Sequence, residues 1–195
     1  MKIYPHYSTQ GFVNSYLVGN EASGEALIID PGKITGEILN HIENNRYRLS
    51  GICITHNHLN HHAYGLNTWL KIYKPLIYAA DHTLVNNCGK TLRGDCTLQI
   101  GGFLVECFSV PGHSPDSYLF KIENCIFTGD SITAGIAGKT LHSSAAKNLA
   151  EHLSRKLFCH DDNVLIFPGH GPPSTVGIER MFNRPAYTVP SLNAG

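Results

Sequence analysis

The chain has 195 residues, 42% of them hydrophobic, and its fifteen acidic residues balance its fifteen lysines and arginines. This length is enough for one well-buried core and short for two domains, so we expect one domain across residues 1–195. The balanced charge argues against nucleic acid or an anionic membrane surface as a partner, and no apolar run approaches the roughly 20 residues of a membrane span.

Short β-branched or aromatic runs between turn-forming residues predict strands. They lie near 11–18, 25–30, 50–55, 75–79, 97–99, 103–109, 117–122, 124–128 and 163–167. Helical periodicity predicts helices near 34–45, 62–73, 80–87, 145–158 and 174–182. The clearest helix is 145–158, with Ser143 or Ser144 as its expected N-cap. Strand pairs in each half, with helices between them, predict an α/β fold of two facing sheets with helices outside.

The cysteines and the N-terminus indicate a cellular location. The six cysteines never form a C-x-x-C pair, and several lie in strand-like runs. This is typical of reduced, buried thiols in a cytosolic protein. The first residues lack the apolar core of a signal peptide, so we expect a cytoplasmic protein.

Histidine is the one residue type in clear excess, and four of the twelve histidines stand within the run 55–62, Thr-His-Asn-His-Leu-Asn-His-His. Neutral imidazole is the commonest protein ligand for zinc and similar metals. Pro-Gly turns precede His113 and His170, and a Gly-Asp turn ends at Asp130. Each of these segments follows a strand-like run, so their side chains are expected to converge at one edge of a sheet. The sequence therefore predicts a metal centre.

Together these segments resemble the metallo-β-lactamase superfamily, whose signature is His-x-His-x-Asp-His followed by a later His, a bridging Asp and a last His. Pro-Gly-His-Ser-Pro at 111–115, Phe-Thr-Gly-Asp at 127–130 and Pro-Gly-His-Gly-Pro at 168–172 are most similar to its compact glyoxalase II-like (hydroxyacylglutathione hydrolase-like) branch. The resemblance implies a four-layer αββα sandwich without a separate C-terminal substrate domain. The run 175–185 resembles the last helix of compact members, so we expect a complete chain.

The resemblance also implies two metal sites that share Asp130. The first takes His56, His58, His113 and Asp130, and the second takes His61, Asp130 and His170 with Asn60 where the family has aspartate. Zinc is the expected metal, although iron and manganese accept the same ligands. A carboxamide offers one neutral oxygen in place of a charged carboxylate, so the second metal should bind more weakly. We therefore expect one or two divalent ions.

The implied reaction is attack by a metal-bound hydroxide on a small thioester or ester, with Asn60 and Asp130 as catalytic residues. Asn60 is able to hydrogen-bond the attacking water but not to accept its proton. By position, Lys139 matches a basic residue that holds the carboxylate of a glutathione thioester; a solvated surface lysine is the alternative. A small-molecule substrate is therefore the expected partner, and the sequence predicts no oligomeric state.

Two alternatives remain open at this point. One is an iron-dependent persulfide dioxygenase, whose ligands would match His56, His113 and Asp130. The other is a metal-binding homologue with weak or no catalysis because of Asn60. Of the neighbouring residues, Asp30 is expected to shape a turn near the site. His62 is expected on a helix surface; the alternative is that it substitutes for the missing carboxylate.

Overall fold

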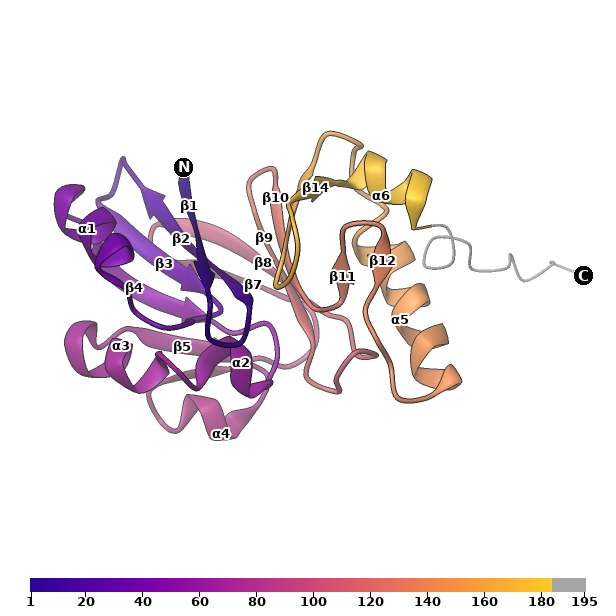
Figure 1. The fold of residues 1–195 in the computed structure, drawn as a ribbon, viewed down its shortest axis with the longest axis horizontal. Coiled ribbons are helices and arrows are strands. Elements are labelled where there is room, and N and C mark those ends of the chain that lie inside the picture. The colour runs from indigo at the N-terminus through magenta and orange to yellow at the C-terminus, as the bar shows by residue number, and fades with distance from the viewer. Residues whose placement is uncertain (184–195) are drawn as a thin grey trace, which may run out of the picture.

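The computed structural model describes residues 1–183, which form two six-stranded sheets packed face to face with helices on the outer faces (Figure 1). The predicted four-layer αββα sandwich is confirmed. The predicted single domain and the run 175–185 extend into residues 184–195, which lie outside the described part of the chain. No helix among the described residues is long and apolar enough to cross a membrane.

The first sheet is built from the N-terminal half of the chain. Its strands, in spatial order, are β1 (Lys2–Ser8), β2 (Val13–Asn20), β3 (Glu25–Ile29), β4 (Arg48–Cys53), β5 (Leu76–Ala79) and β6 (Gly89–Thr91). β1 to β3 run antiparallel, whereas β3 to β6 run parallel and need helical crossovers. The crossovers carry α1 (Gly36–Asn44), α2 (Leu59–His62), α3 (Leu66–Tyr73) and α4 (His82–Val85). Apolar residues of α1, α3 and α4 bury the outer face of this sheet.

The second sheet is built from the C-terminal half of the chain and also carries helices on its outer face. Its strands, in spatial order, are β14 (Ser174–Thr175), β13 (Leu165–Pro168), β10 (Cys125–Gly129), β9 (Tyr118–Ile122), β8 (Phe103–Ser109) and β7 (Cys96–Ile100). α5 (Ser143–Lys156) and α6 (Val176–Phe182) lie against its outer face. Leu149 and Leu153 of α5 are fully buried there, and burial of each such side chain stabilises the fold by roughly 1.5–3 kcal/mol.

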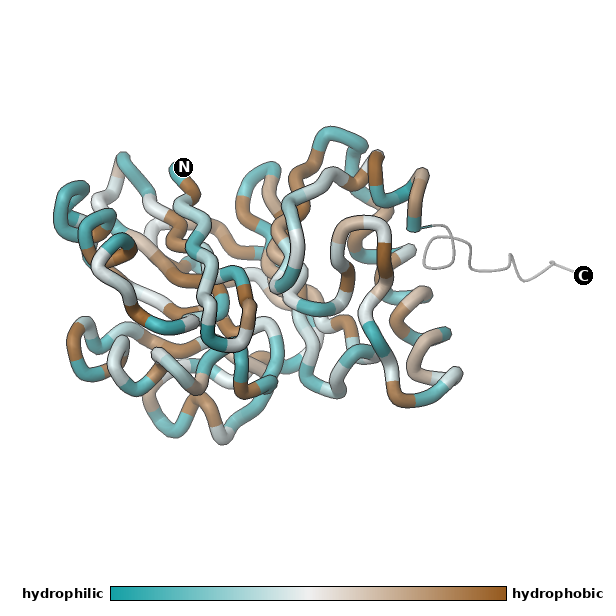
Figure 2. Tube along the Cα trace, viewed as in Figure 1, coloured by the Kyte–Doolittle hydropathy of each residue, from teal (hydrophilic) through white to brown (hydrophobic). Residues whose placement is uncertain are grey.

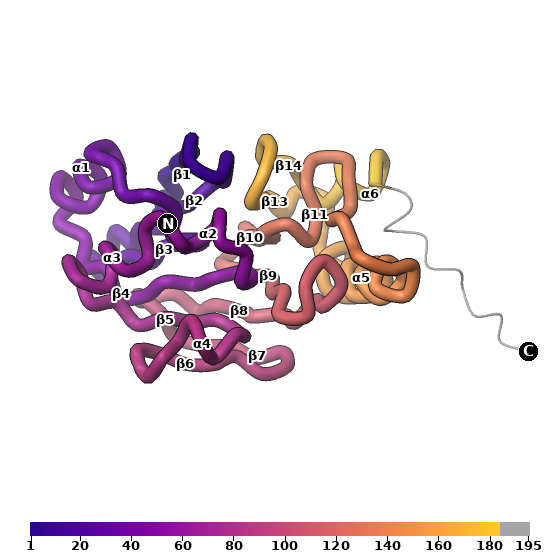
Figure 3. The backbone as a smooth tube through the Cα atoms, turned by 60° about the horizontal axis from the view of Figure 1, so that its bottom comes forward, coloured from indigo at the N-terminus to yellow at the C-terminus, as the bar shows by residue number. Residues whose placement is uncertain are grey.

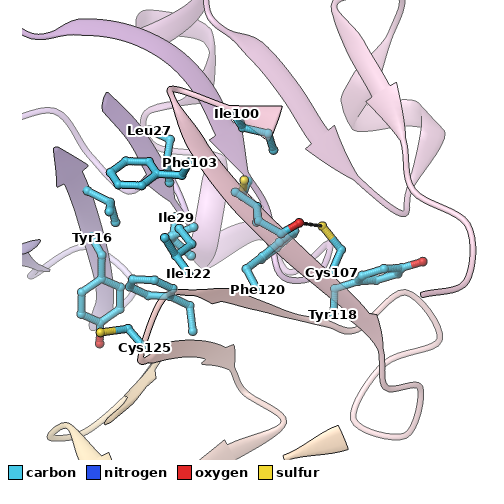
Figure 4. Close-up of a cluster of buried hydrophobic side chains, with 14 of the residues drawn as sticks. Tyr16, Leu27, Ile29, Ile100, Phe103, Cys107, Tyr118, Phe120, Ile122 and Cys125 are labelled. Atoms are coloured by element: carbon cyan, nitrogen blue, oxygen red, sulfur yellow. Dashed lines mark hydrogen bonds between the residues drawn. The ribbon is translucent and has the colours of Figure 1, made fainter. Parts of the chain in front are cut away.

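The inner faces of the two sheets share one apolar core. Tyr16 of β2 contacts the rings of Phe127 and Phe167 from the second sheet, at a centroid distance of 5.3 Å in each case. Figure 2 shows hydrophobic residues along the strands and mainly hydrophilic residues in the turns, and Figure 4 shows side chains of both sheets in this core. The phenol of Tyr16 also donates to the carbonyl of Pro168, 2.6 Å away, so the core joins β2 to the turn after β13.

The strands that precede the predicted ligands end at one edge of the sandwich. β10 and β13 are parallel, and β8 runs in the same direction as β10 because both are antiparallel to β9. The backbone of Tyr118 donates to the carbonyl of Thr55, 2.8 Å away, and so brings the end of β4 to the second sheet. In Figure 3 the turn that carries α2 lies where the two halves meet.

All nine predicted strands are present, and the differences lie in less regular segments. β1 is an additional edge strand that was not predicted, because Pro5 argues against a strand. Proline is nevertheless tolerated in a strand at the edge of a sheet. The predicted helix 62–73 is instead two helices that flank Gly65, where a Cβ would collide with the backbone of Gly32. The predicted serine N-cap of α5 is also wrong: its N-cap is His142, which makes no side-chain capping bond.

The cysteine prediction holds only in part. All six cysteines are free thiols, and Cys53, Cys107 and Cys125 are buried. Cys88 and Cys159 are exposed, so the expectation of buried thiols is wrong for these two. Neither residue lies in a strand of the core. The alternation of side chains along a strand therefore does not turn their side chains inward.

Candidate metal centre

The loop after β4 is organised by Asp30. The backbone N–H and the hydroxyl of Thr55 each donate to this carboxylate, at 2.8 Å. Asp30 adopts a left-handed backbone conformation with φ 51°, which is unfavourable for most residues other than glycine. The structure agrees with the expectation that Asp30 shapes a turn near the site, and these bonds offset the strain.

The first predicted set of ligands comes together. His56 Nε2 lies 2.9 Å from His58 Nδ1, which lies 3.2 Å from His113 Nε2. Asp130 Oδ2 lies 3.8 Å from His56 Nε2 and 3.7 Å from His113 Nε2. The four ligand atoms lie within 4.8 Å of one another. Three imidazoles and one carboxylate at this spacing suit a tetrahedral zinc-type site.

The second set lies on the other side of the Asp130 carboxylate. Asp130 Oδ1 is 3.4 Å from His61 Nε2 and 2.6 Å from His170 Nδ1. The amide nitrogen of Asn60 is 3.3 Å from His170 Nε2, so Asn60 stands beside this group. Asp130 therefore directs one oxygen to each set, as a bridging ligand would.

His61 provides a test of whether these residues fit a metal ion. Its Nδ1 lies 3.1 Å from Asp30 Oδ2, so in its neutral form the ring donates there and has its lone pair on Nε2. That Nε2 is buried and has no hydrogen-bond partner. A buried unpaired nitrogen is costly unless it binds something, and beside the Asp130 carboxylate a cation satisfies it. The donor set thus fits a divalent metal.

Two other histidines are held in the tautomer that binds metal through Nε2. His56 Nδ1 lies 3.0 Å from the hydroxyl of Thr55, which itself donates to Asp30. His113 Nδ1 donates to the backbone carbonyl of Lys139 at 2.8 Å. Such outer contacts fix ring orientation and leave the other nitrogen free for the ion.

The protonation states also favour a cation. Burial lowers the pKa of His56 to about 2, which keeps this imidazole neutral. Burial opposes the charged form of Asp130, but its hydrogen bond with His170 and the nearby His61 outweigh it and hold the pKa of this carboxyl below its usual range. Burial likewise opposes the charged form of His61, but Asp30 and Asp130 raise its pKa to about 9. A metal ion at Nε2 would take the place of that proton.

Glycine is required where the last ligand turn meets the others. A Cβ on Gly169 would lie 2.5 Å from the His61 ring and 2.8 Å from Asp130 Oδ1. The Pro-Gly-His turn therefore places its backbone directly against both ligands. Asn14 holds this turn, because its backbone N–H donates to the carbonyl of Gly169 at 2.7 Å.

Asn57 anchors the loop between His56 and His58. Its backbone N–H donates to Asp116 at 2.7 Å, and its side-chain amide donates to Asp81 at 2.6 Å. Its side-chain oxygen lies 2.7 Å from His62 Nε2, which must be the donor. His62 is buried, so the prediction of a helix-surface residue is wrong. Nor does it stand in for the missing carboxylate, since its ring turns to Asn57.

We expect His62→Leu to lower the metal affinity of the first site by about tenfold, because loss of an outer-shell partner typically costs 10–100-fold. His62→Gln should remain close to the unmodified protein, because its amide is able to donate to Asn57. A competition titration with a chromophoric chelator, together with Co²⁺ spectra, measures the effect. His152→Leu on α5 is the matched control. An equal loss in the Leu and Gln variants would mean that only the packing of the ring matters.

A cavity of about 380 Å³ opens beside the ligands. His113, Asp130 and His170 form one side, and the segment from Thr133 to Lys139 forms the other. This segment includes the short hairpin of β11 (Ile132–Thr133) and β12 (Ile136–Ala137). The site is therefore open to a small molecule.

The fold is a sandwich of two sheets with a centre of histidines and one aspartate at one edge, which is typical of a class of metalloproteins. Comparison with known proteins identifies this class. A model of the metallo-beta-lactamase superfamily matches residues 8–95. An uncharacterised protein of Treponema pallidum is 32% identical over 176 residues, which cover 90% of this chain and 94% of that protein. The chain belongs to the metallo-β-lactamase superfamily.

Other similar proteins include a named enzyme and two solved structures. A hydroxyacylglutathione hydrolase of Chromohalobacter salexigens is 27% identical over 158 residues, which cover 80% of this chain but only 60% of that enzyme. The crystal structure of ETHE1 from Myxococcus xanthus superposes with a TM-score of 0.80 at 23% identity, covering 96% of this chain and 85% of that one. A di-iron-bound protein, TTHA1623, has a TM-score of 0.74 at 23% identity, covering 92% and 98%. These two structures share the fold.

The structure brings all six predicted metal ligands and Asn60 to one place, and their roles as ligands stay predictions. Lys139 is different, because its side chain is exposed at the cavity while its carbonyl holds His113. Sequence reasoning missed Thr55, Asn57 and Asp116. Asn57 stands inside the histidine motif, which was the one available signal.

Proposed function

We propose that the protein is a metal-dependent hydrolase of a small thioester or ester. The observation that carries this proposal is the pair of ligand sets that share Asp130, with His61 Nε2 buried and unpaired between them. Divalent ions bound there would polarise the substrate carbonyl and lower the pKa of a water to about 7.

The protein's own groups would position the reactants. Asp130 directs one carboxylate oxygen to each group of ligands, so it would hold the two ions next to each other. Asn60 lies half-buried next to His170, where its amide would be able to hydrogen-bond the water or the substrate oxygen. Because Asn60 is unable to accept a proton, the natural chain is expected to be a slow hydrolase.

The cavity suggests a substrate with an apolar part and an anionic end. Ile136 and Ala137 give it an apolar wall, suited to an acyl group. Lys139 lines the same wall, and its ammonium has no ion-pair partner among residues 1–183. A glutathione thioester, which carries carboxylates, combines these features, and the likeness to hydroxyacylglutathione hydrolases supports the same choice. Zinc is the metal that we propose.

The alternative of an iron-dependent persulfide dioxygenase stays a prediction. It would use His56, His113 and Asp130, whereas His58 Nδ1 lies within 2.9 and 3.2 Å of the two histidine nitrogens of that set. These distances give no reason to leave His58 out of the set of ligands. Bound iron with oxygen uptake on glutathione persulfide would favour this alternative.

The test begins with elemental analysis of protein purified without chelator or added metal, followed by hydrolysis of a hydroxyacyl thioester of glutathione. One or two zinc ions per chain with hydrolysis support the proposal; iron without hydrolysis contradicts it. We expect Lys139→Gln to raise KM about tenfold, about 1.4 kcal/mol, with little change in kcat. Lys147→Gln, an exposed lysine on α5, is the control. An unchanged KM would identify Lys139 as a solvated surface residue.

A further inference from the structure

Two cysteines face each other across the hairpin of β7 and β8. Cys96 pairs with Cys107 in the antiparallel register, which begins at the Gly101–Gly102 turn. Directly opposite residues of such a pair have Cα atoms about 4.5–5.5 Å apart, inside the roughly 4.4–6.8 Å that a disulfide requires. Side chains of opposite residues also lie on the same face of the sheet.

Both thiols point to the core between the sheets. Cys107 is fully buried there, next to Phe120 on the neighbouring strand (Figure 4). Cys96 packs against the same core but remains partly accessible. Cys96 is therefore the more accessible of the two residues, and Cys107 is enclosed by the core.

We propose that Cys96 and Cys107 form a redox modification site that closes to an intramolecular disulfide with a low-molecular-weight disulfide such as glutathione disulfide. Neither cysteine belongs to the two groups of metal ligands, and the proposal does not depend on the proposed hydrolase function.

The exchange balances in two steps. The Cys96 thiolate attacks one sulfur of glutathione disulfide, forms a mixed disulfide and releases one glutathione thiolate. The Cys107 thiol then gives up its proton, attacks the Cys96 sulfur and releases the second glutathione. Two protein thiols are oxidised and one glutathione disulfide is reduced to two thiols.

The order of attack follows from the surroundings of the two sulfurs. Burial, together with the neighbouring Cys96, raises the pKa of the Cys107 thiol to about 12, so it is a poor first nucleophile. Once Cys96 carries the glutathione, Cys107 lies directly opposite the mixed disulfide. This proximity compensates for the low reactivity of its thiol. A bond whose Cys96 side is accessible is expected to be readily reversed by thiols.

The test treats the metal-loaded protein with glutathione disulfide, then unfolds it in denaturant, blocks free thiols with iodoacetamide and maps the peptides by mass spectrometry. Trypsin releases both cysteines in the single peptide 94–121, and cleavage after Glu106 then separates them. We expect 94–106 and 107–121 to remain joined in most molecules until a thiol is added. Cys96→Ser should abolish this link and leave Cys107 free to be alkylated. Cys88→Ser combined with Cys159→Ser removes the two exposed thiols and should leave the link intact.

Two outcomes would overturn the proposal. The first is glutathione on Cys88 and Cys159 while Cys96 and Cys107 are both alkylated. The second is a bond from Cys107 to Cys53, the other buried thiol near it, which is recognised because Cys53 falls in the tryptic peptide 49–71.

Discussion

Asn60→Asp is expected to raise the second metal's affinity and the rate of thioester hydrolysis, each by about tenfold or more, equivalent to about 1.4 kcal/mol. The Asn60 amide lies 3.3 Å from His170 Nε2, so a carboxylate of the same shape would face the group formed by His61, Asp130 and His170. It would add a negative charge, which increases affinity for a divalent cation, and a group that accepts a proton from water.

Elemental analysis and kcat/KM, measured on the same preparations, check this result. Asn67→Asp on α3 places the same charge on an exposed helix position and serves as control. A variant that gains metal without gaining rate would mean that the second ion does not limit catalysis. A natural chain that already binds two ions, with a rate that the variant leaves unchanged, would refute the idea of a homologue weakened by Asn60.

Asp130→Asn should have the largest effect, a loss on the order of 10³ in kcat/KM or about 4 kcal/mol, together with loss of metal from both sites. The reason is that Asp130 Oδ2 faces His56 and His113, while Oδ1 faces His61 and His170. An amide keeps the shape but removes the charge and leaves one oxygen for two cations.

Metal content and kcat/KM are again the measurements, with circular dichroism to show that the variant is folded. Asp162→Asn is the control, since that carboxylate pairs with Arg180 at the surface, where an ion pair contributes little. Retention of one full metal equivalent in folded Asp130→Asn would show that the two sites do not share this carboxylate.

The elements that carry the chemistry could be predicted from the amino-acid sequence. Strand runs and the turns after them are local features, because alternation and Gly or Pro turns depend on neighbouring residues. For this reason the positions of His113, Asp130 and His170 at strand ends were predictable. The αββα fold and the set of metal ligands followed from the resemblance carried by these motifs, and Asn60 was recognisable as the one departure.

The contacts that hold these residues in place depend on the three-dimensional fold. The contacts of Asp30 with Thr55 and His61 join the ends of β3 and β4, and the carbonyl that orients His113 comes from Lys139, a distant residue. The sequence predicted a surface position for His62, but in the structure this residue is buried beside Asn57. A hydrogen-bond partner is chosen by which segments meet at the sheet edge, and that depends on packing between elements far apart in the chain.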